Sequence, residues 1–167
     1  MSALDFYAHV ATRRDVLGAG AGAHPDRWEA ALGRGFLDVP GDGLLRRDYG
    51  LVEINFAPDP RGRMSCFGFG IEIHRLLHDR SPSAVPVPLS RHYGEFAPRV
   101  PFGELQAAVS ALGRTAELDD VSRDMHRYRV SGSGARIHVI VDPGPHGSDD
   151  PGPAGHRAGD VWSIDVW

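Results

Sequence analysis

The 167-residue sequence contains no lysine, so all 18 of its basic side chains are arginine. This excludes a lysine Schiff base and a lysine general base, and it makes every permanent positive charge on a side chain a planar guanidinium that can bind a carboxylate through two hydrogen bonds. Cysteine is almost as scarce. The single thiol, Cys66, rules out an internal disulfide and a zinc site built on cysteines, and it favours a reducing compartment.

An excess of positive charge and a long apolar segment are also missing. The formal net charge is −4 and the pI is about 6.1, whereas proteins that bind nucleic-acid phosphates concentrate basic charge. No stretch approaches the roughly 20 apolar residues that span a bilayer, and the first residues lack a basic region followed by an apolar run. We therefore expect a cytoplasmic protein that binds neither nucleic acid nor membrane, and its mild acidity permits a basic protein partner.

Helical spacing of apolar residues predicts three helices. The first covers residues 4–11 and continues weakly to residue 17, and the second begins at residue 25, where Pro25 and then an aspartate suit a first turn. The third follows residue 101 and ends at Gly113. Residues 79–101 contain five prolines, which predicts an ordered surface crossing rather than a helix.

Alternating apolar residues predict an antiparallel sheet. A hairpin formed by residues 52–56 and 67–73 gives the clearest signal, and further strands are expected in residues 125–130, 135–142 and 161–167. The residues expected to face the core are Val52, Ile54, Phe56, Phe67, Phe69, Ile71 and Ile73 from the hairpin, and Trp162, Ile164 and Val166 from the last strand. The sequence thus predicts a single α+β domain over residues 1–167, with helices packed on one face of the sheet and a flexible loop at residues 143–159.

Polar residues on the opposite face of the hairpin form the candidate site. Glu53, Asn55, Glu72 and His74 alternate with the apolar set. Neighbouring strand positions lie within about 5 Å of each other, so these side chains can serve acid–base chemistry. The same alternation is typical of a solvated or partner-covered face, and we favour that interpretation. Two further residues are added to the predicted partner-binding set, Asp48 at the start of the hairpin and Trp167 at the chain end.

Other reactive residues have plainer interpretations. The sequence has nine histidines, and His74 and His78 have the spacing of a helical ligand pair, but His74 is expected to end a strand, so we predict no metal site. Cys66 is interpreted as a small buried hydrophobe and the arginine pair at residues 46–47 as solvated. The FGFG segment at residues 67–70 lacks a GxGxxG pattern, so its glycines are expected to permit close packing or a bulge, and no cofactor is predicted.

The segment RRDYGLVEINF followed by FGFGIEIHRL, residues 46–56 and 67–76, resembles a block in small actinobacterial proteins. Some of those proteins resemble the immunity proteins that accompany polymorphic toxins. The resemblance implies a non-catalytic cytoplasmic protein that occludes the active site of a toxin, and it covers about thirty residues without any catalytic signature.

Three functions remain open from the sequence. The first is a non-catalytic protein-binding module, of which an immunity protein is one form. The second is a small hydrolase or metal-dependent enzyme that uses Glu53, Glu72 and His74. The third is a structural subunit that oligomerises through an exposed strand edge.

Overall fold

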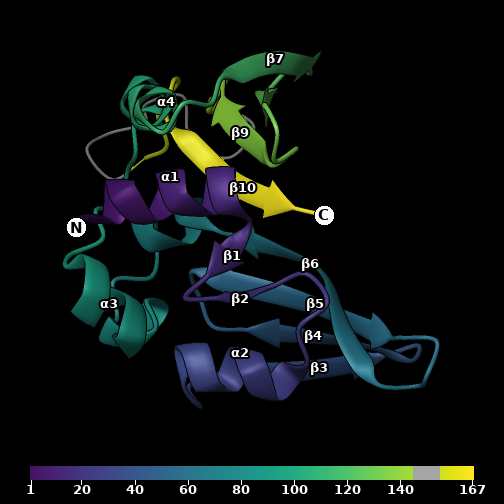
Figure 1. Ribbon diagram of the computed structural model, residues 1–167. Coiled ribbons are helices and arrows are strands. Elements are labelled where there is room, and N and C mark those ends of the chain that lie inside the picture. The colour runs from purple at the N-terminus through teal and green to yellow at the C-terminus, as the bar shows by residue number, and fades with distance from the viewer. Residues whose placement is uncertain (145–154) are drawn as a thin grey trace.

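The computed structural model describes residues 1–144 and 155–167, and it confirms a single α+β fold around an antiparallel sheet (Figure 1). The helices are α1 (Ala3–Arg13), α2 (Pro25–Leu32), α3 (Val87–Tyr93) and α4 (Phe102–Ala111), with the 3-10 turns η1 (Ile73–Leu77) and η2 (Pro82–Ala84). The large sheet contains β3 (Leu37–Gly41), β4 (Leu44–Asp48), β5 (Val52–Pro58), β6 (Met64–Ile71), β7 (Ala116–Val121), β8 (Met125–Val130), β9 (Arg136–Ile140) and β10 (Val161–Val166). A separate small sheet pairs β1 (Asp15–Val16) with β2 (Ala19–Gly20). In the described residues, no helix is both long and apolar enough to cross a membrane.

Two four-stranded meanders meet in the middle of the large sheet. The strand order is β3-β4-β5-β6-β10-β9-β8-β7, and neighbouring strands are antiparallel. The central pair places Ile164 of β10 opposite Ile71 of β6, and Asp165 opposite Gly70. The C-terminal strand therefore lies directly beside the hairpin that carries the candidate site.

One face of the sheet is buried with the helices. The strand residues Val52, Ile54, Phe69, Ile71, Ile137, Ile164 and Val166 are fully shielded from solvent, as are Phe6, Trp28, Leu89 and Leu105 from the helices. In Figure 1, α1 lies along β10, against which it packs. Burial of each large apolar side chain contributes about 1.5–3 kcal/mol relative to exposure, so this layer is the main source of stability.

The predicted core register is wrong at two aromatic residues, and a β-bulge explains each. Phe67 is 44% exposed because the β5–β6 pairing shifts by one residue beside it, and Cys66 takes the inward position. Trp162 lies at a similar shift in the β9–β10 pairing, where Val161 is buried instead. A bulge adds one residue to a strand and changes which side chains face inward, so a strict period of two places these residues on the wrong face.

Two predictions about helices are also corrected. Helix α1 ends at Arg13 rather than near residue 17, because Arg14 adopts a left-handed backbone with φ of 64°. Residues 79–101 contain α3 in spite of their prolines. Pro86 occupies the position before this helix and Pro88 lies in its first turn, where the N–H that proline lacks would have no partner inside the helix.

The sequence analysis predicted no strand at β1, β2, β3 or β7, and one predicted loop lies largely outside the described residues. The exposed strand β7 has the sequence AELDDV, which is too polar to show a clear apolar alternation. The predicted flexible loop at residues 143–159 falls largely on residues 145–154, which lie outside the described residues.

The turn between β4 and β5 depends on Gly50. Its φ is 85°, and a β-carbon there would lie 2.6 Å from the carbonyl oxygen of Ala84. We expect Gly50→Ala to lower the free energy of unfolding by about 2 kcal/mol, because the left-handed backbone and the close approach both oppose a side chain. Gly22→Ala is the matched control, since Gly22 has a φ of 82° but nothing within 4 Å of an added β-carbon. Urea denaturation measures both losses, and equal losses would show that the contact with Ala84 contributes nothing.

Candidate functional site

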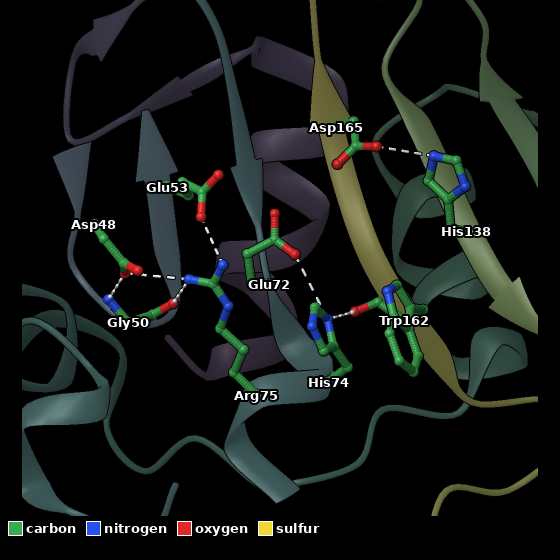
Figure 2. Close-up of polar contacts among 9 residues, drawn as sticks. All are labelled: Asp48, Gly50, Glu53, Glu72, His74, Arg75, His138, Trp162 and Asp165. Carbon is green, nitrogen blue, oxygen red and sulfur yellow. Dashed lines mark hydrogen bonds and ion pairs between the residues drawn. The ribbon is translucent and has the colours of Figure 1, made fainter. Parts of the chain in front are cut away.

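Polar side chains gather where β5, β6 and β10 meet the turn η1 (Figure 2). Glu53 of β5 lies opposite Gly70 of β6, which lies opposite Asp165 of β10. Glu53 and Asp165 alternate with the buried residues Ile54 and Ile164, so their side chains project from the face away from the core. Gly70, between them, has no side chain and leaves space above the middle strand.

Arg75 is the centre of an ionic network on this face, as Figure 2 shows. Its Nη2 atom lies 2.6 Å from Glu53 Oε2, and its Nη1 atom lies 3.1 Å from both Asp48 Oδ1 and the carbonyl oxygen of Gly50. Burial opposes the charge of Arg75, but the hydrogen bond to Glu53 and the nearby carboxylates raise its pKa. One guanidinium therefore holds two of the predicted site residues, Asp48 and Glu53.

Glu72 and His74 do not continue the strand as the alternation predicted. Strand β6 ends at Ile71, and Glu72 precedes the 3-10 turn η1, in which Ile73 and Leu76 are buried. Residues three apart eclipse each other in a 3-10 turn, so these two apolar residues share one side. His74, which lies between them, turns toward β10, and its Nδ1 atom approaches the carbonyl oxygen of Trp162.

The Glu72 carboxylate lies over Gly70. A β-carbon on Gly70 would lie 2.5 Å from Glu72 Oε1 and 3.3 Å from Asp165 Oδ1, so the glycine makes room for the carboxylate. Burial raises the pKa of Glu72 to about 7; Arg75 opposes this shift, while Asp165 and Glu53 add to it. Protonated and ionised forms of Glu72 therefore coexist near neutral pH.

His74 contacts Glu72 without forming a charged ion pair at neutral pH. Its Nδ1 atom lies 3.5 Å from Glu72 Oε2 and 3.3 Å from the carbonyl oxygen of Trp162, and its ring stacks on the indole with centroids 4.0 Å apart. Burial lowers the pKa of His74 to about 4, so the ring is neutral at pH 7. The Nδ1 atom then donates to the carbonyl of Trp162, and Glu72 gains no ionic attraction from the ring.

The C-terminal half supplies residues that the sequence did not identify. His138 Nε2 on β9 lies 2.9 Å from Asp165 Oδ2 on β10, and Trp162 supports His74. Arg75 was missed as well. No sequence spacing relates Arg75, His138 or Asp165 to Glu53. His138 and Asp165 do alternate with apolar residues of predicted strands, and this alternation indicates that they lie on the polar face.

The remaining predicted residues, Asn55 and Trp167, lie beside this network. Asn55 pairs with Gly68 of β6, and a β-carbon on Gly68 would clash with the indole of Trp167. Trp167 thus covers β6 at this point while staying 54% exposed. The two glycines of the FGFG segment make room for an indole and a carboxylate, in keeping with the close packing expected there.

The cavity beside this face and the chain's single thiol bear on catalytic chemistry. An open cavity of about 440 Å³ adjoins the network and is lined by Asp48, His74 and Arg75 among others, but not by Glu53 or Glu72. Within residues 1–144 and 155–167, no group of three or more His, Cys, Asp or Glu side chains is arranged to hold a metal ion. Cys66 is buried as predicted, and burial raises the pKa of its thiol to about 11, which disfavours a thiolate nucleophile.

A scan against protein-family models, a search of curated proteins and a search of solved structures each gave no match to this chain. The resemblance to immunity proteins therefore stays a prediction from the sequence. Support for a function comes from the geometry and electrostatics of the polar face.

Glu72 is expected to make stability depend on pH. Its pKa in the folded protein is about 7, above the ordinary value of 4.5, so between these values the folded chain binds a proton that the unfolded chain releases. This contribution to stability is fully present below about pH 4.5 and is lost as the pH rises through 7. We expect the unfolding free energy of Glu72→Gln minus that of the wild type to rise by on the order of 2 kcal/mol from pH 5 to pH 8.

The stability of the wild type alone does not isolate the effect of Glu72, because His74 makes stability change with pH in the opposite direction. Its depressed pKa of about 4, against an ordinary 6.5, contributes stability that is lost as the pH falls from 6.5 through 4. Urea denaturation across the pH range measures the difference, with the exposed residue Glu104 of α4 changed to Gln as the control. A difference that stays constant with pH would contradict the placement of Glu72.

Proposed function

We propose that this protein is a non-catalytic protein-binding module that binds a basic partner on the face around Glu53 and Glu72. The state of Glu72 is the observation that supports this most. Its side chain is only 18% exposed, it projects from the face away from the core, and it contacts a neutral imidazole. A carboxylate that has lost much of its hydration in this way gains free energy when a guanidinium or ammonium group reaches it.

The neighbours of Glu72 are already paired with other groups. Arg75 is engaged by Asp48 and Glu53, while Asp165 shares its other oxygen with His138. A β-carbon on Gly70 would lie 2.5 Å from Glu72 Oε1 and 3.3 Å from Asp165 Oδ1, so the carboxylates of Glu72 and Asp165 lie close together over this glycine. A partner cation that reached this pair would interact with both carboxylates, and complementarity of this kind selects the partner and speeds encounter.

An immunity protein is the form of this function that the sequence resemblance suggests. Such a protein acts by covering a toxin's active site, and it needs a rigid, charged surface rather than catalytic groups. Here the carboxylates are held by strands and by a short turn, and the exposed indole of Trp167 lies beside them as an aromatic anchor of the type common in interfaces. A toxin with a basic active-site surface would fit this face.

Charge reversal tests the proposal. The product of the adjacent gene is the first partner to examine, by calorimetry with the purified full-length chain. We expect Glu72→Arg and Glu53→Arg each to weaken binding by about 1–3 kcal/mol, which is about 5-fold to 150-fold in the dissociation constant, and the loss to shrink at high salt.

The matched control is a charge reversal on a helix, away from the polar face of the sheet. Glu104→Arg makes the same charge change on the exposed side of α4 and should leave the affinity within twofold. Circular dichroism checks that all variants stay folded. Unchanged affinity in both site variants, with the control behaving alike, would place the binding surface elsewhere.

A second candidate, acid–base catalysis, is favoured by the pKa of Glu72. A carboxyl group with a pKa near 7 beside Glu53, which is paired with a guanidinium, resembles the acid–base pairs of hydrolases. The adjoining cavity, however, does not bring a bound substrate to either carboxylate. Substrate turnover that Glu72→Gln abolishes with the fold intact would replace the binding proposal.

Oligomerisation through a strand edge finds less support. The edge strand β3 is exposed along its length but contains Pro40, and the edge strand β7 carries Asp119 and Asp120 at a bulge. Proline, charge and bulges on edge strands are the features by which proteins resist pairing with another strand.

A further inference from the structure

A pair of histidines outside the carboxylate network has the geometry of a metal chelate. His78 directly follows η1 and His156 precedes β10, and their Nε2 atoms lie 3.2 Å apart. The sequence spacing had pointed to a different pair, His74 with His78. His74 instead stacks on Trp162, and the ring that meets His78 comes from 78 residues further along the chain.

The separation of the two rings is close to that in a zinc chelate of two histidines. Two imidazole nitrogens bound at about 2.05 Å to one tetrahedral zinc ion lie about 3.3 Å apart, with their ring centroids about 5.2 Å apart. A straight N–H···N hydrogen bond with a nitrogen separation of about 3.2 Å would hold the centroids about 5.5 Å apart. The actual centroids are 5.1 Å apart and the ring planes are inclined by 78°. The nitrogen and centroid separations of this pair are thus both within about 0.1 Å of those of a two-imidazole chelate.

The backbone of His78 and the ring of His156 are ordered before any metal arrives. The His78 amide donates to the carbonyl oxygen of Arg75, which fixes the backbone at the end of η1. The His156 ring packs on Trp162 with centroids 5.0 Å apart, and that indole is itself stacked on His74. Ligands that are already ordered lose less conformational entropy on binding.

We propose that His78 and His156 chelate one divalent transition-metal ion of the Zn²⁺, Ni²⁺ and Cu²⁺ group. Imidazole nitrogen suits these ions, whereas Mg²⁺ and Ca²⁺ take oxygen ligands. Since the described residues offer no group of three such ligands, water completes the coordination. His78 is exposed and His156 partly so, which gives water access.

The ion would join the segment before β10 to the end of η1 and stabilise the folded chain by binding it in preference to the unfolded one. Neither Glu53 nor Glu72 takes part. The metal site therefore does not depend on the proposed binding function, and either can fail alone.

Calorimetry with ZnCl₂, NiCl₂ and CuCl₂ tests the site, using the untagged full-length chain at pH 7.5 in a buffer that does not bind metals. We expect one equivalent to bind at micromolar to sub-millimolar concentration, most tightly for Cu²⁺. His78→Ala and His156→Ala should each weaken binding at least tenfold. His92→Ala, at an exposed position at the end of α3, is the matched control and should change it less than twofold.

Electron paramagnetic resonance of the Cu²⁺ complex adds a readout that a merely structural role would not change. The wild type should show hyperfine coupling to two imidazole nitrogens, and each site variant to one. Wild-type affinity in His78→Ala or in His156→Ala would overturn the proposal, as would the absence of any binding below 1 mM. His78→Gln, which keeps a polar side chain, replaces His78→Ala if circular dichroism shows that the latter is unfolded.

Discussion

Replacing Trp28 with alanine should lower the free energy of unfolding by about 3–5 kcal/mol. The Trp28 side chain is fully buried in α2, and its ring meets that of Phe69 on β6 edge-to-face with centroids 5.1 Å apart. Truncation removes the transfer free energy of the indole and leaves a cavity between helix and sheet, and the pair of rings adds about 0.5–1.5 kcal/mol beyond area burial. Urea denaturation followed by circular dichroism measures the loss.

The other two tryptophans provide matched controls with the same substitution. Trp167 is 54% exposed and Trp162 is partly exposed, so Trp167→Ala and Trp162→Ala should each cost less than half as much as Trp28→Ala. The relative costs of the three substitutions also test the bulge in β10, because the sequence predicts that Trp162 lies in the core. If Trp162→Ala proved the most costly of the three, the assignment of Val161 to the buried position would be wrong.

The fold was predictable from the sequence where a periodic pattern carried the information. The helix at residues 25–32 was found because Pro25 and Asp26 mark a first turn, and the hairpin because residues 52–56 alternate cleanly. The bulges beside Phe67 and Trp162 were not predictable, since each depends on the partner strand and leaves no mark on the period. The same limit applies to β7, whose polar residues are stabilised by pairing with β8 rather than by a buried face.

The candidate site was predictable in part, and the reason differs from one site residue to the next. Glu53 was found because it alternates with buried residues, and its position is confirmed. Glu72 was found by an alternation that actually ends one residue earlier, so its place near Asp165 follows from the turn η1. Arg75 had no sequence signal, and the alternation around His138 placed it only on the polar face of its own strand. The pairing of distant strands and the folding of η1 bring these two residues to the site.

A buried arginine gives the second large effect on stability, and it corrects the expectation that Arg46 and Arg47 are both solvated. The side chain of Arg47 is 6% exposed, and its Nε and Nη2 atoms lie 2.8 Å and 3.0 Å from the two carboxylate oxygens of Asp38. The guanidinium also donates to the carbonyl oxygen of Pro25 and lies 3.7 Å from the ring centroid of Phe36. This group therefore ties β4 to β3 and to the start of α2.

Asp38→Ala should lower the free energy of unfolding by about 3 kcal/mol, because it leaves the buried Arg47 guanidinium without its anion. This lies at the lower end of the range for breaking a buried ion pair, since the Asp38 side chain is 35% exposed and water can replace part of the lost interaction. The exposed neighbour gives the control, and Arg46→Ala should change stability by less than 0.5 kcal/mol in either direction, roughly the range for surface substitutions.

The double variant Asp38→Ala/Arg47→Met separates the ion pair from its surroundings. Methionine keeps apolar contact with Phe36 and removes the charge, so the double variant should be more stable than Asp38→Ala alone, although it still leaves the carbonyl of Pro25 without its donor. The cost of Asp38→Ala is thus mainly that of an unpaired buried charge, and a double-mutant cycle from urea denaturation measures this coupling. Strictly additive losses would mean that Arg47 and Asp38 contribute independently, against the two short contacts between them.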